Sequence, residues 1–189
     1  MAGKKLIISN KSNKPDNIVM HEAEIYSKCE EFEALMPRFM RSFFIYLRGN
    51  VLPMTRLAYL RDINFFFDYL IKQTDLTGAE KISDIKASEL AELKAMDINL
   101  FIDYCRHYSV FDEESGNTYV YENSNKTLAR KKSSLSVMFK QLYRDEILPK
   151  NITDGFDPIR VQKAGEKEIK ALQDDEVMLM LDASLLLGV

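Results

Sequence analysis

Apolar residues recur at three- and four-residue steps along most of this chain, and that spacing limits the fold more than any other feature. The clearest case is residues 53–71, where Leu57, Leu60, Phe67 and Leu70 follow one another at helical intervals. Alternation with a period of two appears only at residues 118–121. The sequence therefore predicts an all-α bundle over residues 35–150. Its expected buried residues are Leu57, Phe67, Leu70, Leu135, Phe139 and Leu142.

Helix boundaries can be placed from prolines, glycines and capping residues. Helices are expected over about 37–49, 53–71, 88–96 and 97–107, with a last helix starting at its predicted N-cap, Thr127. Residues 1–30 are predicted to be a mobile segment, because the chain begins with a polar stretch. The polar connection 112–125 is expected either to form a hairpin or to stay loose.

Composition favours a cytoplasmic protein of one domain, or of one domain plus a fragment. The chain has 189 residues, of which 46% are hydrophobic, enough for a real core. It has no apolar run near the roughly 20 residues that span a bilayer, and no signal-peptide core at its N-terminus. Cys29 and Cys105 lack CxxC spacing and are expected to be small core residues, not a disulfide or zinc site. No metal or other cofactor is expected.

Charge is unevenly distributed although the net charge is only −3. Residues 125–150 contain seven Lys or Arg against two acidic residues, and residues 35–72 contain six against two. Acidic residues concentrate in 16–34 and 80–114. One cationic face with an acidic back is typical of proteins that dock a polyanion. The alternative is that these charges only solvate exposed helix faces.

The start of the last predicted helix combines hydroxyl groups with cations. Thr127, Arg130, Lys131 and Ser134 fall within its first two turns. Unpaired backbone N–H groups and the positive end of the helix dipole lie there too, so these groups can converge on one phosphate. Such contacts hold a duplex in register but carry little sequence information.

Two ordered motifs point to a known family. The pattern T-x3-Y-x2-D-[ILV]-x2-F-x2-[FY]-L is formed by Thr55, Tyr59, Asp62, Ile63, Phe66, Tyr69 and Leu70. The pattern T-x2-R-x4-L-x3-F-x3-[YL]-R is formed by Thr127, Arg130, Leu135, Phe139, Tyr143 and Arg144. In this order, over about residues 35–160, the chain resembles the N-terminal core-binding domain of tyrosine recombinases of the phage-integrase or Xer-like family. The connection 109–124 is longer than the short turn usual in that family.

The resemblance implies a SAM-like fold, a small orthogonal bundle of four to five helices that closes over one side of double-stranded DNA. It divides the chain into the segment 1–30, a DNA-binding domain over 31–160, and a linker with the first helix of a catalytic domain over 161–189. Full-length family members assemble as tetramers on DNA. The implied DNA-binding residues are Arg41, Thr55, Arg56, Tyr59, Thr127, Arg130, Lys131 and Ser134.

The family cleaves DNA with a tyrosine nucleophile and needs no metal. Its catalytic positions lie beyond the last residue of this sequence, so no catalytic residue is assigned and the chain is expected to be inactive alone. Because Arg130 and Lys131 are expected to be exposed, replacing both by Ala should weaken binding to all duplexes and leave stability nearly unchanged.

Two other functions remain open. A helical protein-interaction module with no role on DNA would use the basic faces to meet an acidic partner, and exposed Phe65, Phe66 or Phe67 would favour it. A small enzyme could use the carboxylates of Asp62, Asp68 and Asp103. That reading requires a deep pocket where these groups converge.

Overall fold

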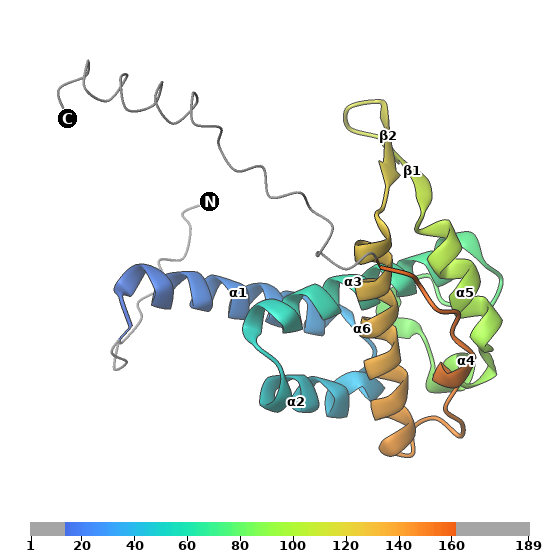
Figure 1. The fold of residues 1–189 in the computed structure, drawn as a ribbon, viewed down its shortest axis with the longest axis horizontal. Coiled ribbons are helices and arrows are strands. Elements are labelled where there is room, and N and C mark those ends of the chain that lie inside the picture. Colours follow the sequence, from blue (N-terminus) through green and yellow to red (C-terminus); the bar gives the residue numbers. More distant parts are fainter. Residues whose placement is uncertain (1–13, 162–189) are drawn as a thin grey trace, which may run out of the picture.

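The structure, a computed structural model, describes residues 14–161, which form a mostly helical body with one β-hairpin (Figure 1). The elements are α1 (Asp16–Leu35), η1 (Arg38–Met40), α2 (Arg41–Asn50), α3 (Pro53–Gln73), η2 (Ile82–Asp84), α4 (Ala87–Glu92), α5 (Ala95–Tyr104), β1 (His107–Asp112), β2 (Asn117–Glu122), α6 (Asn125–Arg144) and η3 (Thr153–Gly155). The expected all-α bundle therefore describes the body of the protein but omits a small two-stranded sheet.

Helices α3 and α6 form the centre of the body. Helix α1 lies along α3, and α6 runs across α3 at a steep angle, with α2 packed against α6 (Figure 1). Phe66 of α3 meets Phe101 of α5 and Phe139 of α6 edge to face, with ring centroids 5.0 and 6.3 Å apart. All six residues expected in the core are buried, which confirms the helical periodicity read from the sequence.

Helix α1 occupies a region where the sequence predicted only a mobile segment. Residues 16–30 of that segment belong to this helix, and residues 1–13 lie outside the described part of the chain. Of its 20 residues only Ile25 and Cys29, one turn apart, are buried. A helix that buries so narrow a stripe gives a weak periodic signal, which explains the omission.

The N-cap of helix α6 lies three residues earlier than the sequence suggested. Ser124 is its N-cap, and the Ser124 hydroxyl accepts a hydrogen bond from the backbone N–H of Thr127 at 3.4 Å. Thr127 as N-cap was therefore wrong, since this residue already lies within the first helical turn. The boundary matters because it places Thr127 and Arg130 deeper in the helix.

The hairpin fills the connection between α5 and α6. His107 pairs with Glu122 at its base and Asp112 with Asn117 at its tip. At the turn, Gly116 has a φ of 67°, which glycine adopts without strain, and its N–H donates to the Asp112 carbonyl at 2.8 Å. Of the two outcomes left open for this connection, the hairpin is the one observed.

No helix within residues 14–161 is long and apolar enough to cross a membrane. The expected linker and first catalytic helix at 161–189 fall outside the described residues, apart from Val161.

Candidate nucleic-acid interface

The crossing of α3 and α6 is held by one buried carboxylate, Asp62, whose side chain is 2% exposed. It accepts a hydrogen bond from the Ser134 hydroxyl at 2.8 Å and one from the Lys131 Nζ at 3.3 Å, and it pairs with the Arg130 guanidinium. A buried carboxylate is costly unless it is paired and hydrogen-bonded. Three donors from α6 meet that requirement, so the start of this helix is tied to the middle of α3.

Arg130 keeps part of its guanidinium at the surface. Its side chain is 43% exposed, and Nη1 also donates to the Ala58 carbonyl at 3.4 Å. Thr55 and Tyr59 are half-buried on α3 and precede Asp62 by seven and three residues, so they share its side of the helix. Thr127 lies one turn before Arg130 on α6. The structure therefore brings Thr55, Tyr59, Thr127 and Arg130 to the same crossing.

Lys131 and Ser134 do not have the expected exposure. Lys131 is 8% exposed, and its Nζ lies 4.6 Å from the centroid of the Phe65 ring as well as beside Asp62. Ser134 is fully buried and donates to Asp62. In this structure their polar groups bind an internal carboxylate, and their contact with a phosphate stays a prediction.

Arg56 is also turned inward. It is 4% exposed and donates through Nε and Nη2 to Glu33 Oε1 of α1, at 3.0 and 2.6 Å. Arg48 of α2 binds the other oxygen of Glu33. Arg56 therefore joins α3 to α1 and, through Glu33, to α2, and its contact with DNA stays a prediction.

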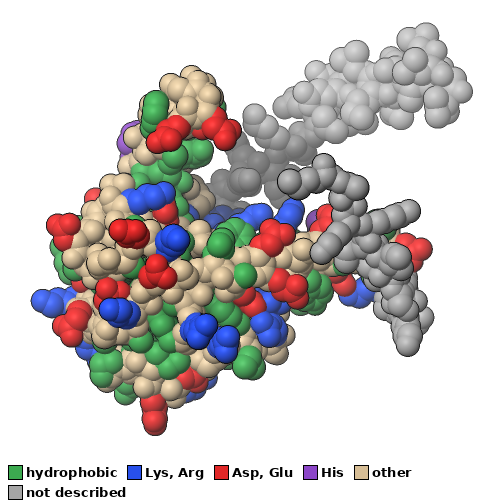
Figure 2. All heavy atoms as spheres, turned by 180° about the vertical axis from the view of Figure 1, so that it is seen from behind, with side chains coloured by type: hydrophobic (Ala, Val, Ile, Leu, Met, Phe, Trp, Pro, Cys, Tyr) green, Lys and Arg blue, Asp and Glu red, His purple; other side chains and the backbone are tan. Residues whose placement is uncertain are grey.

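Arg41 is exposed at the first residue of α2, away from the α3–α6 crossing. No interaction recorded among residues 14–161 links it to Arg130 or Tyr59. Seen from behind, the helical body carries Lys and Arg side chains interspersed with Asp and Glu (Figure 2). This face of the molecule is therefore not uniformly cationic.

Sequence reasoning missed the internal partners Asp62 and Glu33. For Asp62 a signal existed, because it lies one helical turn before Phe66 on the apolar side of α3. A carboxylate on such a side needs a counter-ion. For Glu33 the sequence held no comparable signal, because most of α1 is exposed.

The carboxylates of the small-enzyme alternative do not converge. Asp62 is enclosed by α6, Asp68 pairs with Lys72 at 2.9 Å, and Asp103 pairs with Arg106 at 3.6 Å. Within the described part of the chain, no three His, Cys, Asp or Glu residues are placed to hold a metal ion.

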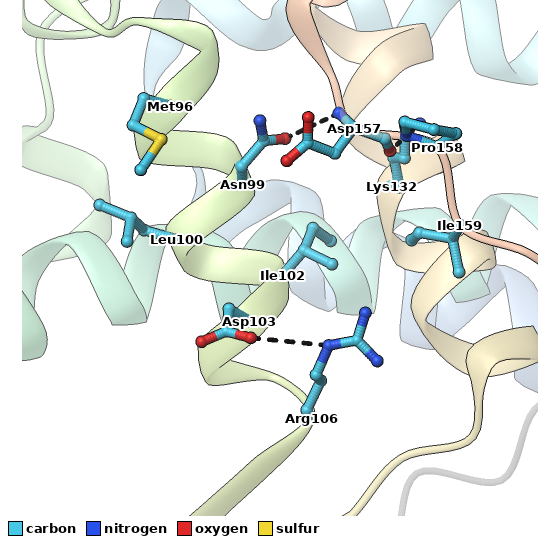
Figure 3. Close-up of a pocket in the computed structure, with 10 residues that line it drawn as sticks. All are labelled: Met96, Asn99, Leu100, Ile102, Asp103, Arg106, Lys132, Asp157, Pro158 and Ile159. Carbon is cyan, nitrogen blue, oxygen red and sulfur yellow. Dashed lines mark hydrogen bonds and ion pairs between the residues drawn. The ribbon is translucent and has the colours of Figure 1, made fainter.

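A hollow of about 310 Å³ lies between α5 and the segment that follows η3 (Figure 3). Most of its polar groups already have partners. Asn99 accepts from the backbone N–H of Asp157 at 3.0 Å, and Lys132 donates to the carbonyls of Phe156 and Asp157. These bonds fasten the outgoing chain to the bundle, so the hollow is better explained as a structural seam than as a catalytic pocket.

The remaining sequence predictions concern cysteines and phenylalanines. Cys29 and Cys105 are free and buried, as expected of core residues, and burial raises the pKa of the Cys105 thiol to about 12. Phe66 and Phe67 are fully buried, and Phe65 is half-buried against Phe101. The exposed phenylalanines that would have favoured a protein-interaction module are therefore not found at these positions.

Comparison with curated proteins finds the tyrosine recombinase XerS of Streptococcus pyogenes. XerS from serotypes M3, M1 and M4 is 32% identical to this chain over 126 residues, which is 65% of this chain and 34% of XerS. This similarity supports a relationship between the chain and the tyrosine recombinase family. The match thus spans about a third of the length of XerS. No protein-family model matches the chain. No solved structure matches it either.

Proposed function

We propose that this chain is the DNA-binding N-terminal part of a site-specific tyrosine recombinase, and that it clamps duplex DNA mainly through phosphate contacts during strand exchange. The observation that carries the proposal is the 32% identity to XerS over 126 residues. DNA breakage and rejoining, and assembly as a tetramer on DNA, are proposed for a longer protein of which this chain supplies one part.

The proposed contact surface is the start of α6 together with the adjoining side of α3. Lys126 and Arg130 supply positive charge, and Thr127, Thr55 and Tyr59 supply hydroxyl groups. The first turn of α6 contains no acidic residue, so the positive end of its dipole is not offset there. A phosphate placed at this helix start would meet cations and hydroxyl groups from two helices.

Asp62, Lys131 and Ser134 would act on this surface indirectly. Asp62 binds one side of the Arg130 guanidinium, and Lys131 and Ser134 hold Asp62 in place. A planar guanidinium has five N–H donors, so Arg130 can bind Asp62 and a phosphate at once. Arg56 would also act indirectly, because its hydrogen bonds to Glu33 hold α3, which carries Thr55 and Tyr59, against α1. Arg41, on α2, is proposed to reach a more distant phosphate of the same duplex.

A salt titration of duplex binding tests the proposal. The double variant Lys126→Ala/Arg130→Ala removes two exposed cations from the start of α6, and Lys140→Ala/Arg144→Ala removes two exposed cations from the other end of the same helix. Each lost phosphate contact should reduce the slope of log K against log salt by about 0.9. We expect the first variant to flatten the slope by about 1 to 2 and the second to change it much less.

Both variants need a folding check, because Arg130 also contacts Asp62. Circular dichroism and thermal melting should show that the helical body persists in each. Equal slopes for the wild type and the first variant, with folding intact, would remove the start of α6 from the DNA-contact surface. An equal effect of both variants would show that only net charge matters.

A further inference from the structure

The β-hairpin combines exposed apolar side chains with a strongly acidic composition. Residues 107–122 include four acidic residues and no Lys or Arg. Phe111 and Val120 are each 62% exposed, and Val110, Tyr119 and Tyr121 are also exposed. The hairpin projects from one end of the body, and Figure 2 shows acidic side chains below its tip. Apolar side chains gathered on such a projection are typical of a docking surface.

The base of this hairpin packs against the helical body, and the next residues of β1 border α3. Tyr108 stacks on Tyr121 and Tyr104, with ring centroids 5.0 and 5.5 Å apart, and lies 5.1 Å from Phe65. Beyond Tyr108 the two strands hydrogen-bond as a two-stranded sheet, and Ser109, Val110 and Phe111 line a hollow with Asp68 and Lys72 of α3. The base therefore fixes the direction of the hairpin and leaves its outer half free to bind.

The acidic composition argues against DNA as the occupant of this surface. Four carboxylates without a cation repel a phosphate backbone, which attracts cationic surfaces instead. Two hairpins from separate copies would repel each other for the same reason. A protein surface that is cationic and partly apolar would fit.

The chain itself provides such a surface on η1 and α2. Residues 35–61 contain five arginines and no acidic residue. Arg38, Arg41 and Arg48 are exposed, and Ile45, one turn from Arg41 and Arg48, is 67% exposed. One acidic residue, Glu33 of α1, pairs with Arg48 and with buried Arg56, which leaves that trio with a net positive charge.

The two surfaces lie far apart in one molecule. Figure 1 shows the hairpin beyond the start of α6, whereas α2 lies beside the other half of that helix. A hairpin cannot reach α2 of its own chain. We propose that the acidic hairpin docks on the outward, arginine-bearing side of η1 and α2 of a second copy of this chain. This contact is head to tail, and it leaves one hairpin and one α2 surface free for further copies.

Sedimentation equilibrium of the 189-residue chain without DNA tests this contact. Low salt, about 50 mM, should favour it, because screening weakens charged surfaces. We expect concentration-dependent self-association of the wild type. Glu113→Lys/Glu114→Lys and Arg38→Glu/Arg41→Glu should each raise the dissociation constant about tenfold or more. Phe111→Ala should raise it as well, because an exposed aromatic anchor is lost.

A combined variant and a control make the test specific. The quadruple variant that carries both charge reversals should recover association, because the two surfaces are again opposite in charge. Glu80→Lys/Glu92→Lys changes the net charge as much as the hairpin variant, at exposed positions elsewhere, and should retain association. A monomeric wild type at high concentration would overturn the proposal. A quadruple variant that stays dissociated would also overturn it. The same holds if association is lost in the hairpin variant but unchanged by the Arg38→Glu/Arg41→Glu reversal.

Discussion

Ser134 of α6 donates a 2.8 Å hydrogen bond to Asp62 of α3, although 72 residues separate the two in the sequence. Arg130 and Lys131 bind the same carboxylate. Part of the cationic helix start that suggested a phosphate site therefore has a structural role. Side chains of α6 donate hydrogen bonds to a carboxylate that is buried on α3. Of these three residues, Arg130 alone keeps a large exposed fraction.

Replacing Asp62 by Ala should destabilise the protein markedly. Lys131, whose side chain is 10% exposed, would lose its carboxylate partner and keep its buried charge. Breaking a buried pair in this way costs about 3 to 5 kcal/mol, and we expect a loss near the lower value because Arg130 can reach solvent. Urea unfolding measures the change.

A surface carboxylate on the same helix is the control for Asp62. Asp68 pairs with Lys72 four residues later, and both side chains are well exposed, at 37% and 64%. Asp68→Ala should change the free energy of unfolding by about 0.5 kcal/mol or less. If the two variants lose equal stability, Asp62 does not hold the helix crossing.

Lys131→Ala should lower stability more than Arg130→Ala. The sequence suggested that neither cation matters for folding, but Lys131 also covers the Phe65 ring at 4.6 Å and is far less exposed than Arg130. Its loss should cost roughly 2 kcal/mol through the buried pair and the lost packing. Chemical denaturation of the two single variants measures which loses more stability. A larger loss for Arg130→Ala would contradict a structural role for the buried Lys131 side chain.

Cys105 should react very slowly with thiol reagents while the protein is folded. Burial raises its pKa from 9.0 to about 12, so at pH 8 the thiolate is roughly a thousandfold rarer than in the unfolded chain. In a Cys29→Ala background, an aromatic disulfide reagent should modify Cys105 rapidly in urea and hardly at all in buffer. Fast modification of the folded protein would show that Cys105 is accessible.

The same shift makes stability depend on alkaline pH. The folded pKa of Cys105 lies above its unfolded value, so folding keeps the thiol protonated. Its contribution is fully present below about pH 9 and is lost as the pH rises toward 12. Cys105→Ala should remove this part of the alkaline decline, as unfolding curves at pH 8 and pH 10 would show.

The fold was more predictable than the site because burial leaves a periodic trace and pairing does not. Leu135, Phe139 and Leu142 of α6 recur at helical steps and are fully buried, so their positions could be read directly. By contrast, nothing in the sequence says that Lys131 faces inward while Lys132, its neighbour, turns to the outgoing chain. A charged residue on a helix is ambiguous until the packing of a second helix is known.

The seam between η3 and α5 offers a last test, at Gly155. A Cβ atom at Gly155 would lie 2.5 Å from the Cβ of Ala95, the first residue of α5. The Gly155 carbonyl also accepts a hydrogen bond from the Asn99 side chain. Gly155→Ala should therefore force the outgoing chain away from α5 and cost about 1 to 3 kcal/mol. Ala95→Gly in the same chain removes the clash, so the double variant should recover most of that loss.

Gly49→Ala is the matched control, because a Cβ at Gly49 in α2 would meet no atom within 4 Å. Alanine is also the better helix former, so this control should be neutral or stabilising by up to about 1 kcal/mol. Thermal melts of all three variants would decide, and a Gly155→Ala protein as stable as the Gly49→Ala protein would show that the seam yields without cost.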